Sequence, residues 1–327
     1  MRSLLAILLV CTLMLLPSAG ALAVESETGV GIRLLDAPTD RRDDPRARSY
    51  IVDHLSPGTT ITRRVEVSNG TSQPVSVQLY AGGAELDDGA FQPLAEPETN
   101  ELTTWTTVDP SRLDLTPGQK APATVTIVVP GDASPGERYG AVWAALSSDP
   151  DAGGVTQVNR VGIRIYLSVG PGGEPASDFT VTSLTAARND DGTPVVTAQV
   201  RNTGGRALDL SGELSLTDGP GGLSGGPFSA ELGTTLGVGE VAPVTIVLDK
   251  ELPNGPWQAN LTLSSGILER SVSAEITFPD SGAGPAVPVE SGNSIGLAPI
   301  LGGVVALLLL GGLMYKVLRR KRRSTPA

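Results

Sequence analysis

The single histidine of this 327-residue chain, His54, is the side chain best suited to act as a general base near neutral pH. Ser49 and Ser56 are the nearby residues that such a base could activate as nucleophiles. The surrounding stretch YIVDHLSPG lacks the Gly-x-Ser-x-Gly turn that presents a nucleophilic serine. We therefore predict a structural histidine, no catalytic residue and no enzymatic activity.

Carboxylates stand side by side at three places, Asp43-Asp44, Asp87-Asp88 and Asp190-Asp191. A catalytic pair must face across a cleft, whereas these residues are sequence neighbours in turn-like stretches, and the last two pairs precede a glycine. Asp149 and Asp151 could contribute oxygens to calcium, but the twelve-residue loop with alternating ligands is absent. The carboxylates are thus interpreted as turn formers, and we predict neither a metal site nor a cofactor.

Aromatic side chains beside polar groups are the usual means of binding glycans and peptides. Trp105, Tyr139 and Trp143 are the candidates in the first half of the chain, and Arg138 could meet a carboxylate of a peptide. The alternative is that these rings fill a hydrophobic core, because Tyr139 and Trp143 flank a predicted strand. The four residues are candidates for ligand contact, and core packing is the favoured interpretation of each ring.

The two ends of the chain carry targeting signals. Residues 1–23 have one basic residue, an apolar core and small residues at Ala21 and Ala23, which is typical of a cleaved signal peptide. Residues 295–315 are uncharged and, as a helix, would extend about 32 Å, enough to cross a bilayer. The basic tail, residues 316–327, follows with Lys316, Arg319, Arg320, Lys321, Arg322 and Arg323. Because cytoplasmic flanks retain such charges, we predict a single-pass plasma-membrane protein with its C-terminus inside and its N-terminal part outside.

The part between these signals is acidic. All 35 acidic residues lie within residues 24–295, whereas Arg2 and the six basic residues of the tail lie outside. The remaining basic residues are scattered and form no cationic stripe, so we exclude nucleic acid as a partner of this part.

Short alternating stretches separated by turn residues indicate an all-β fold. In VGIRIYLSV, apolar residues recur at every second position from Val161 to Val169, which is typical of a half-buried strand. VEVSNGTSQPVSVQLY resembles AQVRNTGGRALDLSGELSL, and each of two later stretches carries a tryptophan, Trp143 or Trp257. This internal repeat predicts two tandem immunoglobulin-like β-sandwiches, residues 24–170 and 171–278, with the boundary at residues 170–177 and a flexible stalk at residues 279–294.

The first repeat resembles the peptidoglycan-binding domain of WxL-interacting proteins of Gram-positive bacteria. The stretches that carry the resemblance are SYIVDHLSPGTTITRRVEVSNGTSQPVSVQLYAGGAELDDGAF, Trp105 ahead of LDLTPGQ, VPGDASPGERYGAVWAAL and VGIRIYLSVG, within residues 29–170. The family shares the layout of signal, two sandwiches, one span and a basic tail. The resemblance implies contact with peptidoglycan or with a wall-bound surface protein.

These observations lead to a membrane-anchored surface protein without enzymatic activity that associates with peptidoglycan or a wall-bound protein. The alternative is a protein-binding adaptor or secretion accessory that offers a sheet edge to another exported protein. A wall hydrolase is the third hypothesis, but the sequence shows neither a nucleophile in a catalytic setting nor a set of metal ligands.

Overall fold

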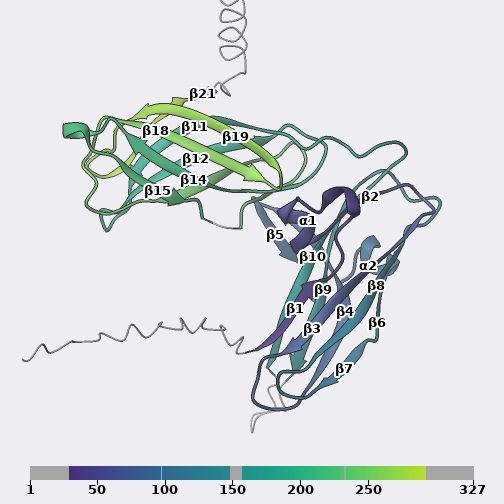
Figure 1. Cartoon of the computed structure of the whole chain (residues 1–327). Helices are drawn as coiled ribbons and strands as arrows, with labels where there is room; N and C mark the ends of the chain where they lie inside the picture. Colours follow the sequence, from purple (N-terminus) through teal and green to yellow (C-terminus); the bar gives the residue numbers. More distant parts are fainter. Residues whose placement is uncertain (1–28, 97, 148–156, 232, 292–327) are drawn as a thin grey trace, which may run out of the picture.

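The computed structural model describes residues 29–96, 98–147, 157–231 and 233–291. In these residues the chain forms two β-sandwiches, which meet so that the molecule is L-shaped (Figure 1). The link between the sandwiches is short, because the last strand of the first ends at Val169 and the first strand of the second begins at Phe179. The fold is therefore all-β, with two immunoglobulin-like modules in tandem.

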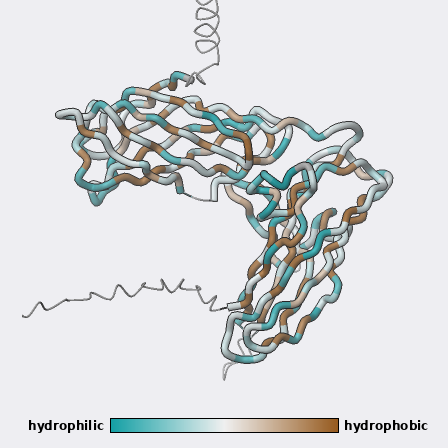
Figure 2. The backbone as a smooth tube through the Cα atoms, in the orientation of Figure 1, coloured by the Kyte–Doolittle hydropathy of each residue, from teal (hydrophilic) through white to brown (hydrophobic). Residues whose placement is uncertain are grey.

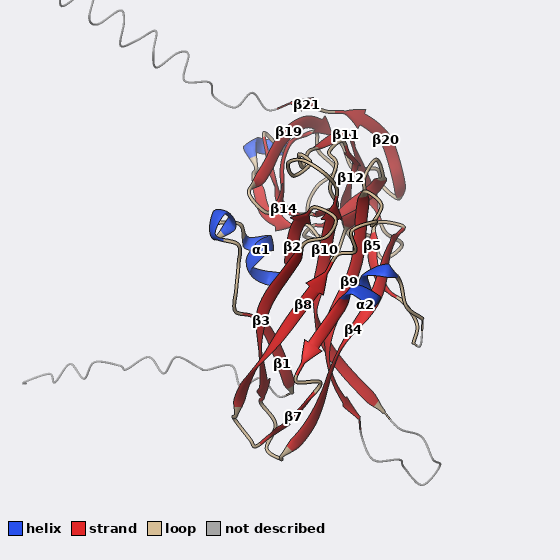
Figure 3. Ribbon diagram, turned by 90° about the vertical axis from the view of Figure 1, so that its right-hand side faces the viewer, coloured by secondary structure: helices blue, strands red, loops and turns tan. Residues whose placement is uncertain are grey.

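The first sandwich consists of two sheets that face each other (Figure 3). One sheet has the order β1 (Val30–Leu34), β3 (Thr60–Asn69), β8 (Lys120–Val128) and β6 (Thr106–Asp109). The other has the order β2 (Ile51–Leu55), β10 (Val158–Val169), β9 (Gly136–Ser147), β4 (Val75–Asp87) and β5 (Ala90–Pro93), and β7 (Arg112–Leu115) also pairs with β4. All pairs are antiparallel except that of β2 with β10, which is parallel.

Short helices lie outside the sheets of the first sandwich. They are η1 (Thr39–Arg41), α1 (Pro45–Ser49) and α2 (Glu101–Trp105). A capping box at Asn100 begins α2. The Asn100 side chain accepts a hydrogen bond from the Thr103 amide, and the Thr103 hydroxyl accepts one from the Asn100 amide. Asp44 caps α1 by accepting from the Arg46 amide at 2.9 Å. Helix α1 lies beside the second sandwich (Figure 1), where Arg46 contacts Asp209.

The second sandwich pairs a four-stranded with a five-stranded sheet. The first has the order β17 (Val241–Val247), β12 (Pro194–Asn202), β11 (Phe179–Arg188) and β20 (Gly282–Pro288). The second has the order β15 (Gly225–Ser229), β14 (Ser211–Thr217), β18 (Trp257–Ser265), β19 (Leu268–Ile276) and β21 (Glu290–Ser291). A small pair, β13 (Leu208–Asp209) with β16 (Thr235–Leu236), and the turn η2 (Pro220–Gly222) complete the module.

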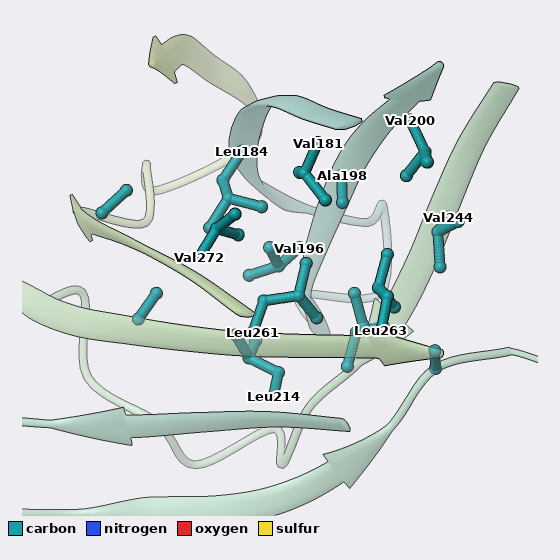
Figure 4. Close-up of a cluster of buried hydrophobic side chains, with 14 of the residues drawn as sticks. Val181, Leu184, Val196, Ala198, Val200, Leu214, Val244, Leu261, Leu263 and Val272 are labelled. Atoms are coloured by element: carbon teal, nitrogen blue, oxygen red, sulfur yellow. The ribbon is translucent and has the colours of Figure 1, made fainter. Parts of the chain in front are cut away.

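Each sandwich has its own hydrophobic core, built from the inward residues of alternating strands. Brown and teal alternate along the strands in Figure 2, as the period of two requires. In the second sandwich, Leu184 and Val196 of one sheet meet Leu214, Leu261 and Val272 of the other (Figure 4). Aliphatic side chains supply most of this burial, since few residues of the chain are aromatic.

The asparagine that ends a strand in each repeat has the same role in both sandwiches. Asn69 is 1 % exposed, and its Nδ2 donates to the carbonyl oxygens of Gln73 and Leu115. Asn202 is also 1 % exposed, and its Nδ2 donates to the carbonyl oxygens of Arg206 and Leu236. The internal repeat seen in the sequence thus corresponds to one repeated structural device, a buried amide that closes the turn after the strand.

Strand β10 departs in part from the half-buried strand that its alternation predicts. Its inward residues Ile163, Ile165 and Leu167 do belong to the core. Val161, however, is 40 % exposed, and Tyr166 on the opposite face is fully buried. The reason is tertiary, because the second sandwich covers the outer face at one end of the strand only.

The predicted stalk at residues 279–294 is wrong for the described residues up to 291. Residues Gly282–Pro288 form β20, which pairs with β11, and β21 pairs with β19. The Gly- and Pro-rich stretch carries no clear alternation, but backbone hydrogen bonds to an open sheet edge do not require one. The second sandwich therefore extends beyond residue 278.

The targeting signals lie outside the described residues. This holds for the predicted signal peptide, residues 1–23, the predicted span, residues 295–315, and the basic tail. Among the helices that the structure does describe, none has the length and apolar character needed to cross a membrane.

Candidate functional site

The junction between the two sandwiches contains a network of polar groups that is largely buried. The Tyr166 hydroxyl of β10 donates to Asp209 Oδ1 of β13 at 2.6 Å, across the domain boundary. Arg46 of α1 donates from Nε to Asp209 Oδ2 at 2.6 Å, and Arg164 donates to Asp209 Oδ1 at 3.1 Å. The Thr235 hydroxyl also donates to Oδ1, at 2.9 Å. The Asp209 carboxylate of the second domain thus accepts hydrogen bonds from four side chains, three of which belong to the first domain.

An aromatic cluster surrounds this carboxylate. The Arg46 guanidinium lies over the Tyr166 ring, 4.2 Å from its centre. The rings of Tyr50, Phe91 and Tyr139 each lie within 6.0 Å of the Tyr166 ring, centre to centre. Burial raises the pKa of the Tyr166 hydroxyl, and the Asp209 charge raises it further, so the hydroxyl keeps its proton and remains a donor.

A second buried contact crosses the junction in the opposite direction. Arg206 of the second domain is 1 % exposed and donates from Nη2 to the Asp53 carbonyl oxygen of the first domain at 3.1 Å. Its Nε lies 3.4 Å from Glu137 Oε1, and Glu137 Oε2 accepts from the Ala207 amide at 2.6 Å. Burial raises the pKa of the Glu137 carboxyl, while the Ala207 amide and the Tyr139 hydroxyl counteract that shift.

The four candidate ligand-contact residues do not form one site. Trp105 ends α2, half-buried, and the Arg138 guanidinium lies 5.0 Å from the centre of its ring. Arg138 also donates to Glu101 Oε2 at 2.7 Å. Tyr139 instead points to the domain junction, where its hydroxyl donates to Glu137 Oε2 at 2.9 Å. Trp105 and Arg138 therefore contact each other, whereas Tyr139 lies at the junction between the two domains.

Trp143 occupies a different place, on the outer face of the sheet that contains β4, β9 and β10. A Cβ atom on Gly82 would lie 2.5 Å from its Nε1, and one on Gly162 would lie 2.5 Å from its Cε3. The ring therefore rests on two strands that lack side chains at these positions. Arg160 lies over the ring at 4.7 Å and donates to Glu96 at 2.6 Å. Core packing within the sandwich is thus the wrong interpretation for Trp143.

His54 is paired with a residue that the sequence analysis did not consider. Its Nδ1 lies 3.1 Å from Ser168 Oγ, on the adjacent parallel strand, and not beside Ser49 or Ser56. Ser168 is 3 % exposed. His54 Nε2 is buried and has no hydrogen-bond partner among the described residues. The third group that orients a catalytic histidine is therefore not found in the described part of the chain.

Of the paired carboxylates, Asp88 and Asp191 lie in turns, as predicted, whereas Asp44 caps a helix and Asp87 ends strand β4. Asp44 caps α1, Asp88 has φ +47° in the turn between β4 and β5, and Asp191 accepts from the Thr193 amide and hydroxyl. Asp149 and Asp151 lie outside the described residues. The described ranges contain no cluster of three or more groups that could hold a metal ion.

One edge of β10 is unpaired over part of its length, although β1 lies close to this strand. Residues 158–164 pair with β9 on one side, whereas β2 pairs only with Ile165 to Val169 on the other. Within the described residues no strand pairs with the second side of residues 158–164. Val158 and Val161 are 53 % and 40 % exposed there. We call residues 158–164 the β10 edge.

The sequence analysis missed Arg46, Arg206 and Asp209. Each is a charged residue in a short, turn-rich stretch, which normally indicates a solvated surface. No local signal marks such a residue as buried, because the group that buries it belongs to the other domain. The alternation of β10 puts Tyr166 on the face opposite the apolar residues, and this tyrosine is buried because the second domain covers it.

Comparisons with known proteins give limited information. No protein-family model matches the sequence, and no curated protein matches it. Among solved structures, a chain from the complex of the Salmonella enterica SafA pilin with the SafB chaperone aligns at TM-score 0.39 and 12 % identity, covering 81 % of this chain and 96 % of that one. The YadV chaperone aligns at TM-score 0.38 and 9 % identity, over 76 % and 99 %. The E. coli chaperone DraB aligns at TM-score 0.37 and 13 % identity, over 70 % and 95 %. At these TM-scores the similarities carry no argument about function.

Proposed function

We propose that this chain is a surface protein without enzymatic activity that acts as an adaptor, binding an extended segment of another exported protein at the β10 edge. The observation that carries the proposal is the one-sided pairing of residues 158–164. An unpaired strand edge offers backbone donors and acceptors to an incoming strand, which would add to the sheet.

The side chains of the β10 edge support this use. Val158 and Val161 are large apolar residues that are half exposed beside the open edge. Natural sheet edges are often protected by charged side chains, proline or a bulge. Residues 158–164 contain no proline, and their two charges, Arg160 and Arg164, are paired with Glu96 and Asp209. The edge is also held on a rigid support, since the same strand continues into the buried junction at Tyr166.

In-cell cross-linking tests the proposal with the full-length chain. We expect wild type to give one dominant protein adduct and Val161→Lys to reduce it about tenfold, because a charged edge residue opposes strand addition. Val247→Lys is the matched control, since Val247 is 43 % exposed on β17, an edge strand of the second sandwich. Equal adducts from wild type and Val161→Lys would refute the role of the β10 edge.

A second candidate function is contact with peptidoglycan, as the resemblance to WxL-interacting proteins implies. It is supported by the surface around Trp143, where Tyr80 donates to Glu96 and Arg160 covers the indole ring. Rings next to a carboxylate and a guanidinium are the groups that glycans and stem peptides bind. Retention of the full-length chain on purified sacculi, weakened by Trp143→Ala but not by Leu223→Ala, would favour it. Retention unaffected by both substitutions would exclude Trp143 as the contact.

The cellular location proposed here rests on the sequence of the chain ends. Export by residues 1–23 and anchoring by residues 295–315 would place both sandwiches outside the cell, with peptidoglycan or a wall-bound protein within reach. Protease added to intact cells is then expected to cleave the sandwiches. Full protection of both sandwiches, lost only after lysis, would contradict this location.

A further inference from the structure

A cleft of about 670 Å³ lies between the two domains, beside the link that joins them. Its first-domain side includes Arg41 and Arg46, and its second-domain side includes Arg206 and Ile267. Glu174, in the link between β10 and β11, also lines the cleft. Three arginines and three carboxylates therefore line the cleft, and two of the arginines, Arg41 and Arg206, pair with Glu174.

Glu174 bridges the two domains through both of its oxygens. Oε1 forms an ion pair with Arg206 Nη1, and Oε2 forms one with Arg41 Nη2. The Arg206 side chain is 1 % exposed, that of Arg41 is 19 % exposed, and that of Glu174 is 33 % exposed. The carboxylate is therefore the most accessible member of the group.

The Arg206 guanidinium is held by another part of the fold, whereas Arg41 is held through its backbone only. The Nη2 of Arg206 is fixed by the Asp53 carbonyl oxygen, and the carbonyl oxygen of Arg41 accepts the Asp44 amide at 3.0 Å. Gly172 and Gly173 precede Glu174, are exposed, and have no atom within 4 Å of where a Cβ would stand. Rotation in these glycines would move Glu174 away from the cleft.

The segment after Glu174 would remain in place during such a movement. The Gly205 amide donates to the Ala176 carbonyl oxygen at 2.8 Å, and the Gly204 amide donates to the Asp178 carbonyl oxygen at 3.0 Å. A Cβ on Gly205 would lie 2.7 Å from Pro175 Cβ, so the link packs closely against this turn. Only the part of the link up to Glu174 is therefore free to leave its position.

We propose that this cleft is a carboxylate-binding site, that Glu174 occupies it as an internal ligand, and that a carboxylate on a partner peptide displaces it. Without Glu174, the buried Arg206 would keep Glu137 beside its Nε but lose its anion at Nη1, and a buried charge that loses a partner favours a replacement anion. Arginine pairs carboxylates with directional hydrogen bonds. Of the other acids that line the cleft, Asp44 already caps α1, and Asp43 is its neighbour.

The apolar part of the cleft indicates what stands next to that carboxylate. Ile267 is 77 % exposed in the turn between β18 and β19, and Leu268 and Val52 also line the cleft. An apolar residue beside the carboxylate would cover Ile267. The ligand class is therefore a peptide with a carboxylate next to an apolar side chain, and this inference does not depend on the β10 edge.

Peptide binding to the full-length chain tests the proposal by fluorescence anisotropy. Three labelled hexapeptides rich in valine distinguish the source of the carboxylate: one with a single aspartate and an amidated end, one with asparagine and a free C-terminus, and one with asparagine and an amidated end. Glu174→Gln removes the internal ligand, so we expect it to bind at least one of the first two peptides about tenfold more tightly than wild type, as loss of a tethered competitor predicts. The third peptide should not respond.

Three further variants complete the test. Glu213→Gln, at an exposed position on β14, should bind like wild type. Arg41→Gln added to Glu174→Gln should abolish the gain. Glu174→Asp keeps the charge but shortens the side chain, so we expect a smaller increase in peptide affinity than with Glu174→Gln. If Glu174→Gln does not fold, the affinity of Glu174→Asp provides the test. Equal binding of all three peptides, or no gain with either Glu174 variant over Glu213→Gln, would overturn the proposal.

Discussion

Tyr166 and Asp209 join the two domains through a hydrogen bond of 2.6 Å between a fully buried phenol and a carboxylate that also receives two arginines. The two residues are 43 positions apart and belong to different sandwiches. Because hydrogen bonds to charged groups are stronger than neutral ones, this contact is a main determinant of how the domains are held.

Tyr166→Phe should lower the free energy of unfolding by about 2 kcal/mol, since it removes one buried hydrogen bond to a charge and leaves the ring in place. Urea denaturation of the full-length chain measures the change. Tyr50→Phe is the control, because its ring lies in the same cluster and its hydroxyl bonds to nothing in the described part of the chain. A loss as large in Tyr50→Phe would show that ring packing, and not the bond to Asp209, accounts for the effect.

Glu137→Gln should change how stability depends on pH. Burial raises the pKa of the Glu137 carboxyl in the folded state above the ordinary value of 4.5. Above that pH the folded state binds more protons than the unfolded state, so the contribution of Glu137 is present in acid and is lost as pH rises through its folded pKa. The stability of Glu137→Gln relative to wild type should therefore increase from pH 4.5 upward, as measured by urea denaturation.

Asp36→Asn provides a comparison with the opposite sign. The hydrogen bond from Arg64 lowers the pKa of the Asp36 carboxyl, so its contribution is present above the ordinary value of 3.8 and is lost as pH falls. The difference between Asp36→Asn and wild type should thus shrink in acid. If both variants followed the same pH trend, the roles assigned to burial and to Arg64 would be wrong.

Asn69→Ala and Asn202→Ala should each lower the free energy of unfolding by about 2 to 3 kcal/mol, because each leaves buried carbonyl oxygens without a donor. The groups that lose this donor are the carbonyl oxygens of Gln73 and Leu115 in the first sandwich and of Arg206 and Leu236 in the second. Since each asparagine serves its own sandwich, thermal melting should show the two losses in different modules. Asn260→Ala, at an exposed position on β18, is the matched control. Losses no larger than that of the control would contradict the closing role of the buried amides.

Gly162→Ala should destabilise the first sandwich by about 1 to 3 kcal/mol, because the added methyl group would overlap the Trp143 ring. Trp143→Ala in the same chain should relieve most of that loss. The double-mutant cycle, followed by urea denaturation, measures the coupling between the two positions. Additive effects would show that the ring does not rest on Gly162.

Trp257→Ala should cost more than Trp143→Ala, about 3 to 5 kcal/mol, because the Trp257 ring is 1 % exposed and fills the second core. Its Nε1 also donates to the Pro253 carbonyl oxygen at 3.0 Å. Trp143 lies on an outer face under Arg160. Comparable losses at the two positions, measured as free energies of unfolding, would show that the repeat makes them structurally equivalent.

The sequence repeat aligns Trp143 with Trp257, but the two tryptophans lie in different environments in the structure. Alternation identifies the two faces of a strand, but it does not say which face meets the core when both carry apolar residues. In β9, Val142 and Ala144 face the core, so Trp143 lies outside. In β18 the tryptophan itself faces inward, with Ala259, Leu261 and Leu263.

By itself the sequence determined the all-β class, the two sandwiches and the turn role of the carboxylates at residues 88 and 191, because these depend on short-range alternation and local turn chemistry. Only the tertiary structure decided that Tyr166, Arg206 and Asp209 are buried, that residues 282–288 form a strand, and that Glu174 closes the cleft between the domains. The physical reason is that each of these features depends on a surface supplied by residues distant in the chain, which no local pattern contains.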